Sequence, residues 1–289
     1  MKTHKTVITA AINGVLTDPK QFSVPVTPAE MAQAAADAWN AGATIVHCHF
    51  RDQREGRGAL PTWDPDVVEE ICHAIRVKVP KILINMSTGV LGPDISGPVA
   101  CLERVKPDIA ALNAGSLNYL KAKNDGTWAW KPMLFDNPIE KIEAFLKVMN
   151  ANGIIPECEC FDTGIVRSIA MVERVGLLKK PIEVSLVMGV ASGMPAKAAL
   201  LPILVEELPP GAHWQLIAIG RTEVWDLQRR ACELGGNVRT GLEDTVYLPN
   251  GDKTFSNANL VEALAKTVRE TGHEVATIED TRAMLGLRG

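Results

Sequence analysis

Two histidines, His47 and His49, lie two residues apart at the end of a short apolar run. Side chains alternate between the two faces of a β-strand, so both imidazoles should share one face while Val46 and Cys48 share the other. Two imidazoles at this spacing can bind one metal ion, and the end of a strand is where substrate can reach them. The pattern predicts half of a catalytic metal site; a hydrogen-bonded pair of core histidines is the alternative.

Charged side chains follow the same alternation in two later segments. If the neighbouring cysteines face outward, Glu157 and Glu159 point inward together, and Arg239 shares a face with Glu243. Buried charges are costly unless they are paired or bound to metal, so several strands with inward charges indicate a site. Position alone makes Glu243 a candidate third ligand. Arg239 could instead be a structural partner of Glu159, and which of the two glutamates faces the site stays open.

Two further motifs have structural interpretations beside the chemical ones. Asp244 follows Glu243 directly and could simply cap the next loop. Cys158 and Cys160 have a spacing that could bind metal, but small buried apolar side chains are the favoured interpretation.

The elements that must position these residues alternate along the chain. Apolar β-branched runs alternate with amphipathic helical patterns, and Thr27-Pro28, Asp64-Pro65 and Asn137-Pro138 each place a cap before a proline at a helix start. Eight such units in one chain predict an α/β fold of the (β/α)8 TIM-barrel class, with a doubly wound open sheet as the alternative. The expected strands are Val7–Asn13, Thr44–Phe50, Lys81–Ser87, Ile109–Gly115, Ile154–Asp162, Ile182–Gly189, Trp214–Gly220 and Asn237–Glu243. The expected helices are Pro28–Ala41, Pro65–Val77, Gly97–Val105, Pro138–Asn150, Gly164–Val175, Ala196–Glu207, Glu223–Leu234 and Asn257–Glu270.

Loop lengths predict which end of the barrel carries the site. Helix-to-strand connections are short, whereas strand-to-helix connections such as Arg51–Trp63 and Asn118–Asn137 are long. In such barrels the loops after the strands carry function, so the site is expected at the carboxyl ends of the strands, with Asn118–Asn137 as a candidate lid. We expect residues 1–289 to form one domain, with Thr277–Gly289 as a short C-terminal extension.

Composition excludes several classes of partner. The 289 residues carry a formal net charge of -4, which argues against a nucleic-acid partner because such partners normally require a basic surface. No run of apolar residues is long enough to span a membrane, and no signal peptide is expected at the N-terminus. The 6 cysteines lack Cys-x-x-Cys spacing, which favours reduced thiols and a cytoplasmic location.

An ordered set of motifs across almost the whole chain resembles the β-keto acid cleavage enzyme family. The motifs are Ile8–Gly14, Pro25–Pro28, His47-x-His49-x-Arg51-Asp52, Ile84–Gly89, Leu112–Ser116, Phe161–Gly164, Gly236–Arg239, Gly241–Asp244 and Ser256-Asn257. The order and number of these matches are more specific than any single motif.

The resemblance implies a zinc-dependent enzyme that uses acetyl-CoA as a co-substrate. A β-keto acid would be converted by retro-Claisen chemistry to acetoacetate and the CoA thioester of the shortened acid. The family's zinc ligands match His47, His49 and Glu243, and its proton-abstracting pair matches Arg239 and Asp244. A glutamate of the fifth strand is also implied, with Glu159 favoured over Glu157. The resemblance further implies a homo-oligomer, specifically a homotetramer.

The same resemblance implies where the keto acid binds. The family's substrate-holding serine matches Ser87, and Thr88, Gly89 and Asn113 lie in the accompanying motifs. Two neutral imidazoles and one carboxylate leave zinc with open positions for the keto acid. We expect Asp244 to act as the base that removes a methyl proton from acetyl-CoA.

The chain departs from the family pattern in the loop after the first strand. The family's type member has an acidic residue there that pairs with a substrate ammonium group, whereas this chain has no carboxylate before Asp18. The motif after the fourth strand also lacks a hydroxyl, because it reads Asn113-Ala114-Gly115. An unpaired ammonium group in an apolar pocket is unfavourable, so we expect a substrate tail without positive charge.

Two other functions remain alternatives. A metal-dependent hydrolase of the amidohydrolase type also uses His-x-His in a barrel, but on the first strand and with further histidines on strands five and six. The expected strand six, Ile182–Gly189, contains no histidine. The second alternative is a non-catalytic barrel that binds a small acid and uses its metal structurally, which normally requires four protein ligands.

Overall fold

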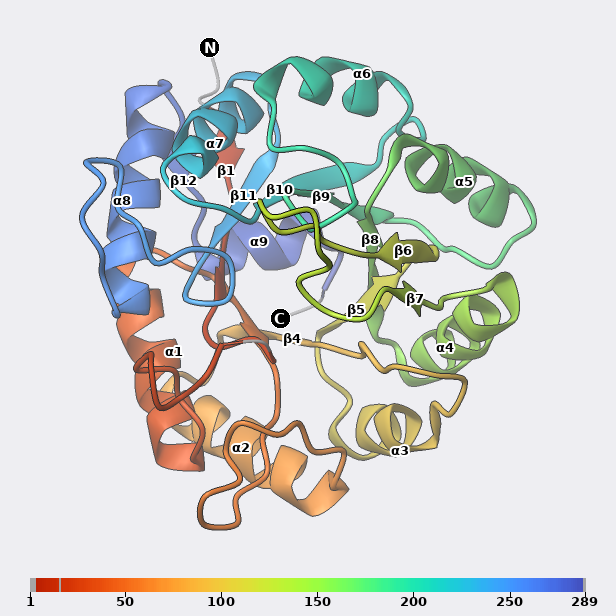
Figure 1. Cartoon of the computed structure of the whole chain (residues 1–289), viewed down its shortest axis with the longest axis vertical. Helices are drawn as coiled ribbons and strands as arrows, with labels where there is room; N and C mark the ends of the chain where they lie inside the picture. The colour runs from red at the N-terminus through yellow and green to blue at the C-terminus, as the bar shows by residue number, and fades with distance from the viewer. Residues whose placement is uncertain (1–3, 16, 288–289) are drawn as a thin grey trace.

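The computed structural model describes residues 4–15 and 17–287 and consists of a closed barrel of parallel strands surrounded by helices (Figure 1). Each strand pairs with the next in the order of the chain, and the last pairs with the first, so the barrel has no open edge. The barrel strands are β2 (Ile8–Ala11), β3 (Ile45–Cys48), β4 (Leu83–Met86), β5 (Ile109–Asn113), β8 (Ile155–Cys160), β9 (Glu183–Met188), β10 (His213–Ala218) and β11 (Asn237–Thr240). The TIM-barrel prediction is confirmed, and all eight expected strands form.

The helices that surround the barrel also follow the predicted pattern. They are α1 (Pro28–Ala41), α2 (Pro65–Lys78), α3 (Ser96–Val105), α4 (Ile139–Asn152), α5 (Thr163–Arg174), η1 (Ala198–Leu200) continuing into α6 (Leu201–Glu206), α7 (Glu223–Glu233) and α8 (Asn257–Glu270). Two predicted caps are confirmed: Thr27 accepts a hydrogen bond from the Glu30 N–H, and Asp64 accepts one from the Asp66 N–H.

The predicted cap at Asn137 is wrong. Helix α4 starts at Ile139 with Pro138 at the cap position, and no side chain of the described residues caps the helix. Asn137 instead anchors the preceding segment: its N–H donates to Ser116 Oγ at 2.7 Å and its Nδ2 donates to the Gly115 carbonyl at 3.3 Å. The side chain that should cap the helix is therefore used to close the base of the loop before it.

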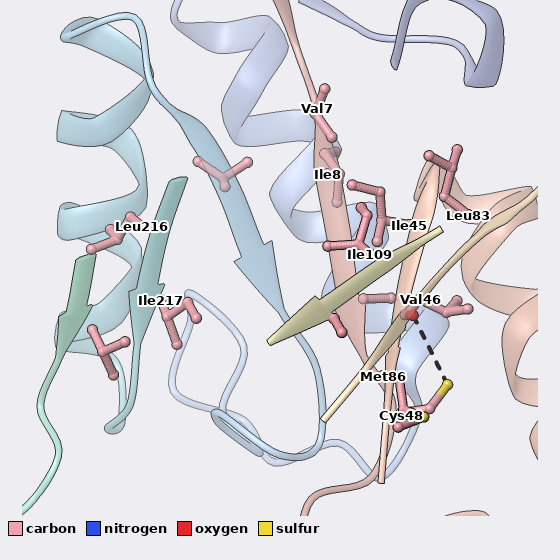
Figure 2. Close-up of a cluster of buried hydrophobic side chains, with 14 of the residues drawn as sticks. Val7, Ile8, Ile45, Val46, Cys48, Leu83, Met86, Ile109, Leu216 and Ile217 are labelled. Carbon is pink, nitrogen blue, oxygen red and sulfur yellow. Dashed lines mark hydrogen bonds between the residues drawn. The ribbon is translucent and has the colours of Figure 1, made fainter. Parts of the chain in front are cut away.

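The hydrophobic core lies on both sides of the barrel wall. Figure 2 shows Ile8, Val46 and Leu83 among the apolar side chains that neighbouring strands contribute. Val46 and Cys48 are fully buried on the face opposite the histidines, as the alternation predicts. This packing fixes the strand register, and the register determines which side chains point into the barrel.

Two additions mark the two ends of the barrel. At the carboxyl ends of the strands, the expected lid segment contains an antiparallel hairpin of β6 (Leu117–Tyr119) and β7 (Met133–Phe135). At the other end, β1 (Lys5–Thr6) pairs with β12 (Glu274–Val275), and α9 (Ile278–Met284) places Met284 and Thr281 beside the first residues of the barrel strands. The C-terminal extension therefore closes the end opposite the predicted site. Among the described residues, no helix has both the length and the apolar character needed to cross a membrane.

Candidate active site

Three predicted metal ligands meet at the carboxyl ends of β3 and β11. The Nε2 atoms of His47 and His49 are 3.3 Å apart, and Glu243 places one oxygen 3.6 Å from His47 Nε2 and the other 3.3 Å from His49 Nε2. Glu243 reaches this place because Gly241, at a φ of 151°, turns the chain directly against the Ala11 backbone. The structure brings these three side chains together from segments about 200 residues apart in the sequence.

The donor set fits a divalent metal ion. Ligand atoms in a tetrahedral zinc site with bonds of about 2.0–2.1 Å lie roughly 3.4 Å apart, close to the three separations here. Burial lowers the pKa of His47 well below its usual range, which keeps the imidazole neutral, while the Arg239 charge holds the pKa of Glu243 well below its usual range against the effect of burial. Glu243 Oε2 is also buried without a hydrogen-bond partner among the described residues. Two neutral imidazoles and an ionised carboxylate are ligands that Zn²⁺ accepts.

The position of His49 is fixed by the end of the first barrel strand. Asn13 is fully buried, and it accepts the His49 N–H at 2.9 Å while its Nδ2 donates to the His49 carbonyl at 2.8 Å. Arg51, which belongs to the same motif as the histidines, has a different role. Its guanidinium donates to backbone carbonyls of Gly14, Thr17 and Gly58, so it ties two loops together and does not reach the metal ligands.

A buried arginine–aspartate pair lies beside the ligands. Arg239 donates from Nε and Nη2 to the two oxygens of Asp244, at 3.1 and 3.0 Å, and its Nη2 lies 2.8 Å from Glu243 Oε1. Arg239 Nη1 is 3.7 Å from Glu159 and has no hydrogen-bond partner among the described residues. Asp244 is therefore a partner of Arg239 and not a loop cap.

Burial shifts the acid–base properties of the two carboxyl groups near Arg239. Desolvation raises the pKa of Asp244 to about 6, because it outweighs the opposing charge of Arg239. Desolvation, with a contribution from the neighbouring Glu157, raises the pKa of Glu159 to about 8. Near neutral pH, the site thus holds a carboxylate at Asp244 and a protonated carboxyl group at Glu159.

Three of the four expected substrate-binding residues lie together at the ends of β4 and β5. The Gly89 N–H donates to Ser87 Oγ at 3.4 Å, and a Cβ at Gly89 would lie 3.6 Å from Asn113 Nδ2. Asn113 pairs in register with Glu159 on β8, so this group adjoins Glu159 and the arginine–aspartate pair. Thr88 differs, because its hydroxyl donates to the Ala111 carbonyl and holds the loop against β5.

The two glutamates of β8 have different surroundings. Both point into the barrel, as alternation predicts, but Glu159 lies near Arg239 whereas Glu157 lies one step deeper in the barrel. Glu157 accepts hydrogen bonds from Asn85, Ser185 and Gln215. These three partners were not predicted from the sequence; the alternation of Asn85 with Ser87 on one strand face was the available signal.

The arrangement places a metal-binding set, an ionised carboxylate and an unpaired guanidinium N–H at one end of the barrel. Such a site can bind an acid with adjacent oxygen atoms, remove a proton from carbon, and stabilise the negative charge that develops.

Comparison with known proteins gives matches along the whole chain. A family model described as "beta-keto acid cleavage enzyme" matches residues 5–287. The 3-keto-5-aminohexanoate cleavage enzyme of Fusobacterium nucleatum is 33% identical over 293 residues, which cover 99% of each chain. The 3-oxoadipate:acetyl-CoA acetyltransferase of Cupriavidus necator is 32% identical, covering 99% of this chain and 96% of that protein.

The solved structures agree on the fold. The apo structure of ObcA superimposes with a TM-score of 0.72 at 20% sequence identity, covering 91% of this chain and 65% of ObcA. At this identity the likeness shows the barrel architecture alone.

Proposed function

This chain belongs to the β-keto acid cleavage enzyme family, and on that premise we propose that it converts a β-keto acid and acetyl-CoA to acetoacetate and a shortened acyl-CoA. The reaction makes it an acyltransferase that exchanges one carbon–carbon bond for another. Relatives carry names that describe cleavage of a keto acid or transfer with acetyl-CoA. We assign the activity to residues 1–289 as a single domain.

The observation that carries the proposal is the meeting of two sets of side chains at one end of the barrel. His47, His49 and Glu243 converge within 4.8 Å, and Arg239 links Glu243 to Asp244 through a single guanidinium group. We propose zinc as the bound ion, held by the three converging residues. When bound, the ion would act as a Lewis acid on the oxygens of the keto acid and make the hydrogens between its two carbonyl carbons more acidic.

The products determine which carbon must be attacked. Acetoacetate contains the acetyl group joined to the first two carbons of the keto acid, so carbon 2 of the keto acid must bond to the thioester carbon of acetyl-CoA. Attack by the acetyl-CoA methyl group on the ketone would instead lead, on cleavage, to free acetate. The expectation that the base acts on acetyl-CoA is therefore replaced by proton removal from carbon 2 of the keto acid.

The residues of this chain can support each step. The Asp244 carboxylate takes a proton from carbon 2, and the unpaired Nη1 of Arg239 donates to the oxygen on which charge develops. Carbon 2 bonds to the thioester carbon, and the carbon–sulfur bond breaks to release the CoA thiolate. The thiolate then adds to the original ketone carbon, the bond between carbons 2 and 3 breaks, and carbon 2 regains the proton from Asp244.

The surroundings of Ser87 and Glu159 suit them to hold the keto acid. Ser87 is 5% exposed, and its hydroxyl contacts the Gly89 N–H, leaving its own proton for an oxygen of the substrate. Asn113 offers an amide beside it. Glu159, with its pKa raised to about 8, can donate a hydrogen bond near neutral pH.

The loop after β2 indicates a substrate tail without positive charge. Gly14 occupies the start of this loop, where a Cβ would lie 2.6 Å from Glu243 Cγ, so no side chain fits there. The next carboxylate, Asp18, accepts hydrogen bonds from the Lys20 N–H and Gln21 Nε2. We therefore propose an apolar or neutral β-keto acid as the substrate; clear preference for a 5-amino over an unsubstituted β-ketohexanoate would contradict this.

The proposed activity can be tested by measuring acetoacetate release from zinc-loaded protein. β-Keto acids with apolar, hydroxylated, anionic and cationic tails would each be supplied with acetyl-CoA, and omission of acetyl-CoA is the control. Acetoacetate that requires acetyl-CoA would support the proposal, and the best tail would identify the substrate class. No acetoacetate with any tail, despite bound zinc, would overturn it.

A further inference from the structure

A second polar cluster lies inside the barrel, one layer below the metal-binding set. Its centre is Glu157 on β8, which is 3% exposed. The carboxyl group accepts hydrogen bonds from Asn85 Nδ2 on β4, Ser185 Oγ on β9 and Gln215 Nε2 on β10. Gln215 Nε2 also donates to Ser185 Oγ at 3.0 Å. Burying a carboxyl group is unfavourable without such partners. The Glu157 carboxyl group has them, and its hydrogen bonds connect four strands of the barrel.

The hydrogen bonds of Glu157 fix the orientation of the Asn85 amide. A group that accepts from Asn85 must face Nδ2, because Nδ2 is the donor of the amide and Oδ1 is its acceptor. Asn85 Oδ1 therefore points away from Glu157. Asn85 is 1% exposed, and its Oδ1 is buried with no hydrogen-bond partner among the described residues.

The complementary unpaired donor lies on the neighbouring strand. His47 pairs in register with Asn85 across β3 and β4, so the two side chains project from adjacent positions of the barrel wall. The Nδ1 atom of His47 is also buried without a partner within the described part of the chain. His47 Nε2 faces His49 and Glu243, so a neutral ring that binds metal through Nε2 must carry its proton on Nδ1. The Nδ1–H group of His47 thus needs an acceptor, and Asn85 Oδ1 needs a donor.

We propose that Asn85 is a positioning residue whose Oδ1 accepts the Nδ1–H of His47 while its Nδ2 is held by Glu157. The link would select the His47 tautomer that presents Nε2 to the metal ion, and it would connect the ligand to the network of Glu157, Ser185 and Gln215. It rests on the metal site of the proposed function. Hydrogen bonds to the second nitrogen of a ligating histidine typically change metal affinity by about 10- to 100-fold.

A buried water is the competing partner for Asn85. A cavity of about 30 Å³ below the network is lined by Asn85, Thr9 and Gln215, and Thr9 Oγ1 is also unpaired among the described residues. One water could fit in that volume and satisfy Asn85 Oδ1 in place of His47. In that case His47 would have no link to the network, and its tautomer would not depend on Asn85.

The first test uses nitrogen-15 NMR of the histidine rings in metal-free wild-type protein, with the His47 signals assigned by their loss in His47→Gln. The proposal predicts that His47 is the tautomer protonated at Nδ1, with a slowly exchanging ring proton. The tautomer protonated at Nε2, or rapid mixing of both, would overturn it. This measurement needs no variant of the network to fold.

The second test compares Asn85→Ala with Ser185→Ala. Each variant removes one donor to Glu157, but only Asn85 adjoins His47, so Ser185→Ala is the matched control. Zinc affinity is measured by competition with a chromophoric chelator, with circular dichroism and thermal unfolding of each metal-free variant as the folding check. We expect about 10-fold or greater loss of affinity and a changed His47 tautomer in Asn85→Ala, with Ser185→Ala within about twofold of the wild type.

The outcomes separate this inference from the proposed function. Equal zinc affinity and an unchanged His47 tautomer in folded Asn85→Ala would overturn the inference while leaving zinc binding and acetoacetate formation intact. Failure of the wild-type protein to bind zinc would contradict the proposed metal site itself. Loss of affinity to the same extent in Ser185→Ala would also overturn the inference, because it would assign the effect to the network as a whole.

Discussion

At the residue scale, Arg239 determines how the site is organised. One guanidinium group holds Asp244 through two hydrogen bonds and contacts Glu243 at 2.8 Å. Its Nη1 lies 3.7 Å from Glu159 and has no hydrogen-bond partner among the described residues. Strand alternation predicted that Arg239 and Glu243 share a face, but β11 ends at Thr240, and the turn at Gly241 is what brings Glu243 to the site. The partners of Glu157 could not be predicted from the sequence, because Asn85, Ser185 and Gln215 meet only through the register of three strands far apart in the chain.

Replacing Asp244 by asparagine should separate proton removal from metal binding. Asp244→Asn keeps an acceptor for Arg239 but removes the basic carboxylate, so we expect bound zinc to remain. Exchange of the carbon 2 hydrogens of the keto acid with deuterated water, above the uncatalysed rate, should slow by about 100- to 10,000-fold. Asp52→Asn, which changes a buried carboxylate held by Arg54 and Arg57, is the control. Wild-type exchange in Asp244→Asn would place the base elsewhere.

Removing His49 should empty the metal site without unfolding the barrel. The side chain of His49 is 13% exposed and lies just beyond β3, so its loss leaves the strand pairing intact. We expect His49→Ala to bind less than a stoichiometric amount of zinc by elemental analysis and to show wild-type circular dichroism. His213→Ala, at the opposite end of the barrel, should keep its zinc. Full zinc occupancy in His49→Ala would refute the ligand assignment.

At the element scale, periodicity predicted nearly every strand and helix because the chain repeats one unit. The structure differs from the predicted elements at two kinds of position. At one, a side chain bonds to a partner other than the predicted one; at the other, a residue has no backbone N–H to donate. Asn137 was expected as a cap but bonds back to Ser116. The expected helix 196–207 is split into η1 and α6, because Pro202 has no N–H and favours the first turn of a new helix. The hairpin of β6 and β7 was expected only as a long loop, because its strands are three residues each.

The loop after β2 should control the position of Glu243. Gly14 has a φ of 83°, and a Cβ would lie 2.6 Å from Glu243 Cγ, so Gly14→Ala must move the ligand. Gly56→Ala is a matched control: its φ is 74°, but its Cβ would meet nothing described within 4 Å. Each variant carries about 1–2 kcal/mol of backbone strain, whereas only Gly14→Ala should lower zinc affinity, by about 10-fold or more. Equal zinc affinity in the two variants, by chelator competition, would show that Gly14 does not limit the ligand's position.

At the scale of the whole molecule, the C-terminal extension and the predicted site lie at opposite ends of the barrel. The α9 helix and the β1–β12 pair close one end, while the predicted site and the β6–β7 hairpin lie at the other. Loop lengths in the sequence predicted this division, because longer connections follow the strands than precede them. The homotetramer and the lid role of Asn118–Asn137 stay predictions.

The buried carboxyl group of Glu159 should make the stability of the metal-free protein depend on pH. Its pKa is raised to about 8 in the folded chain, from the ordinary value of 4.5, mainly by burial. The folded state therefore binds this proton more tightly than the unfolded state, and stability falls as pH rises from 4.5 through 8. We expect Glu159→Gln to reduce the loss of unfolding free energy between pH 5.5 and 8 by about 3 kcal/mol. Urea unfolding at both pH values, without metal, measures the effect; identical losses in variant and wild type would contradict the assigned environment.

In the proposed reaction, carbon 2 of a β-keto acid bonds to the acetyl group of acetyl-CoA at this site. The most direct measurement follows acetyl-CoA labelled with carbon-13 in both acetyl carbons, incubated with zinc-loaded protein and an unlabelled β-keto acid. We expect acetoacetate labelled at carbons 3 and 4, together with unlabelled shortened acyl-CoA. Unlabelled free acetate with the label retained in a β-keto acyl-CoA, or acetoacetate without label, would contradict the proposed reaction.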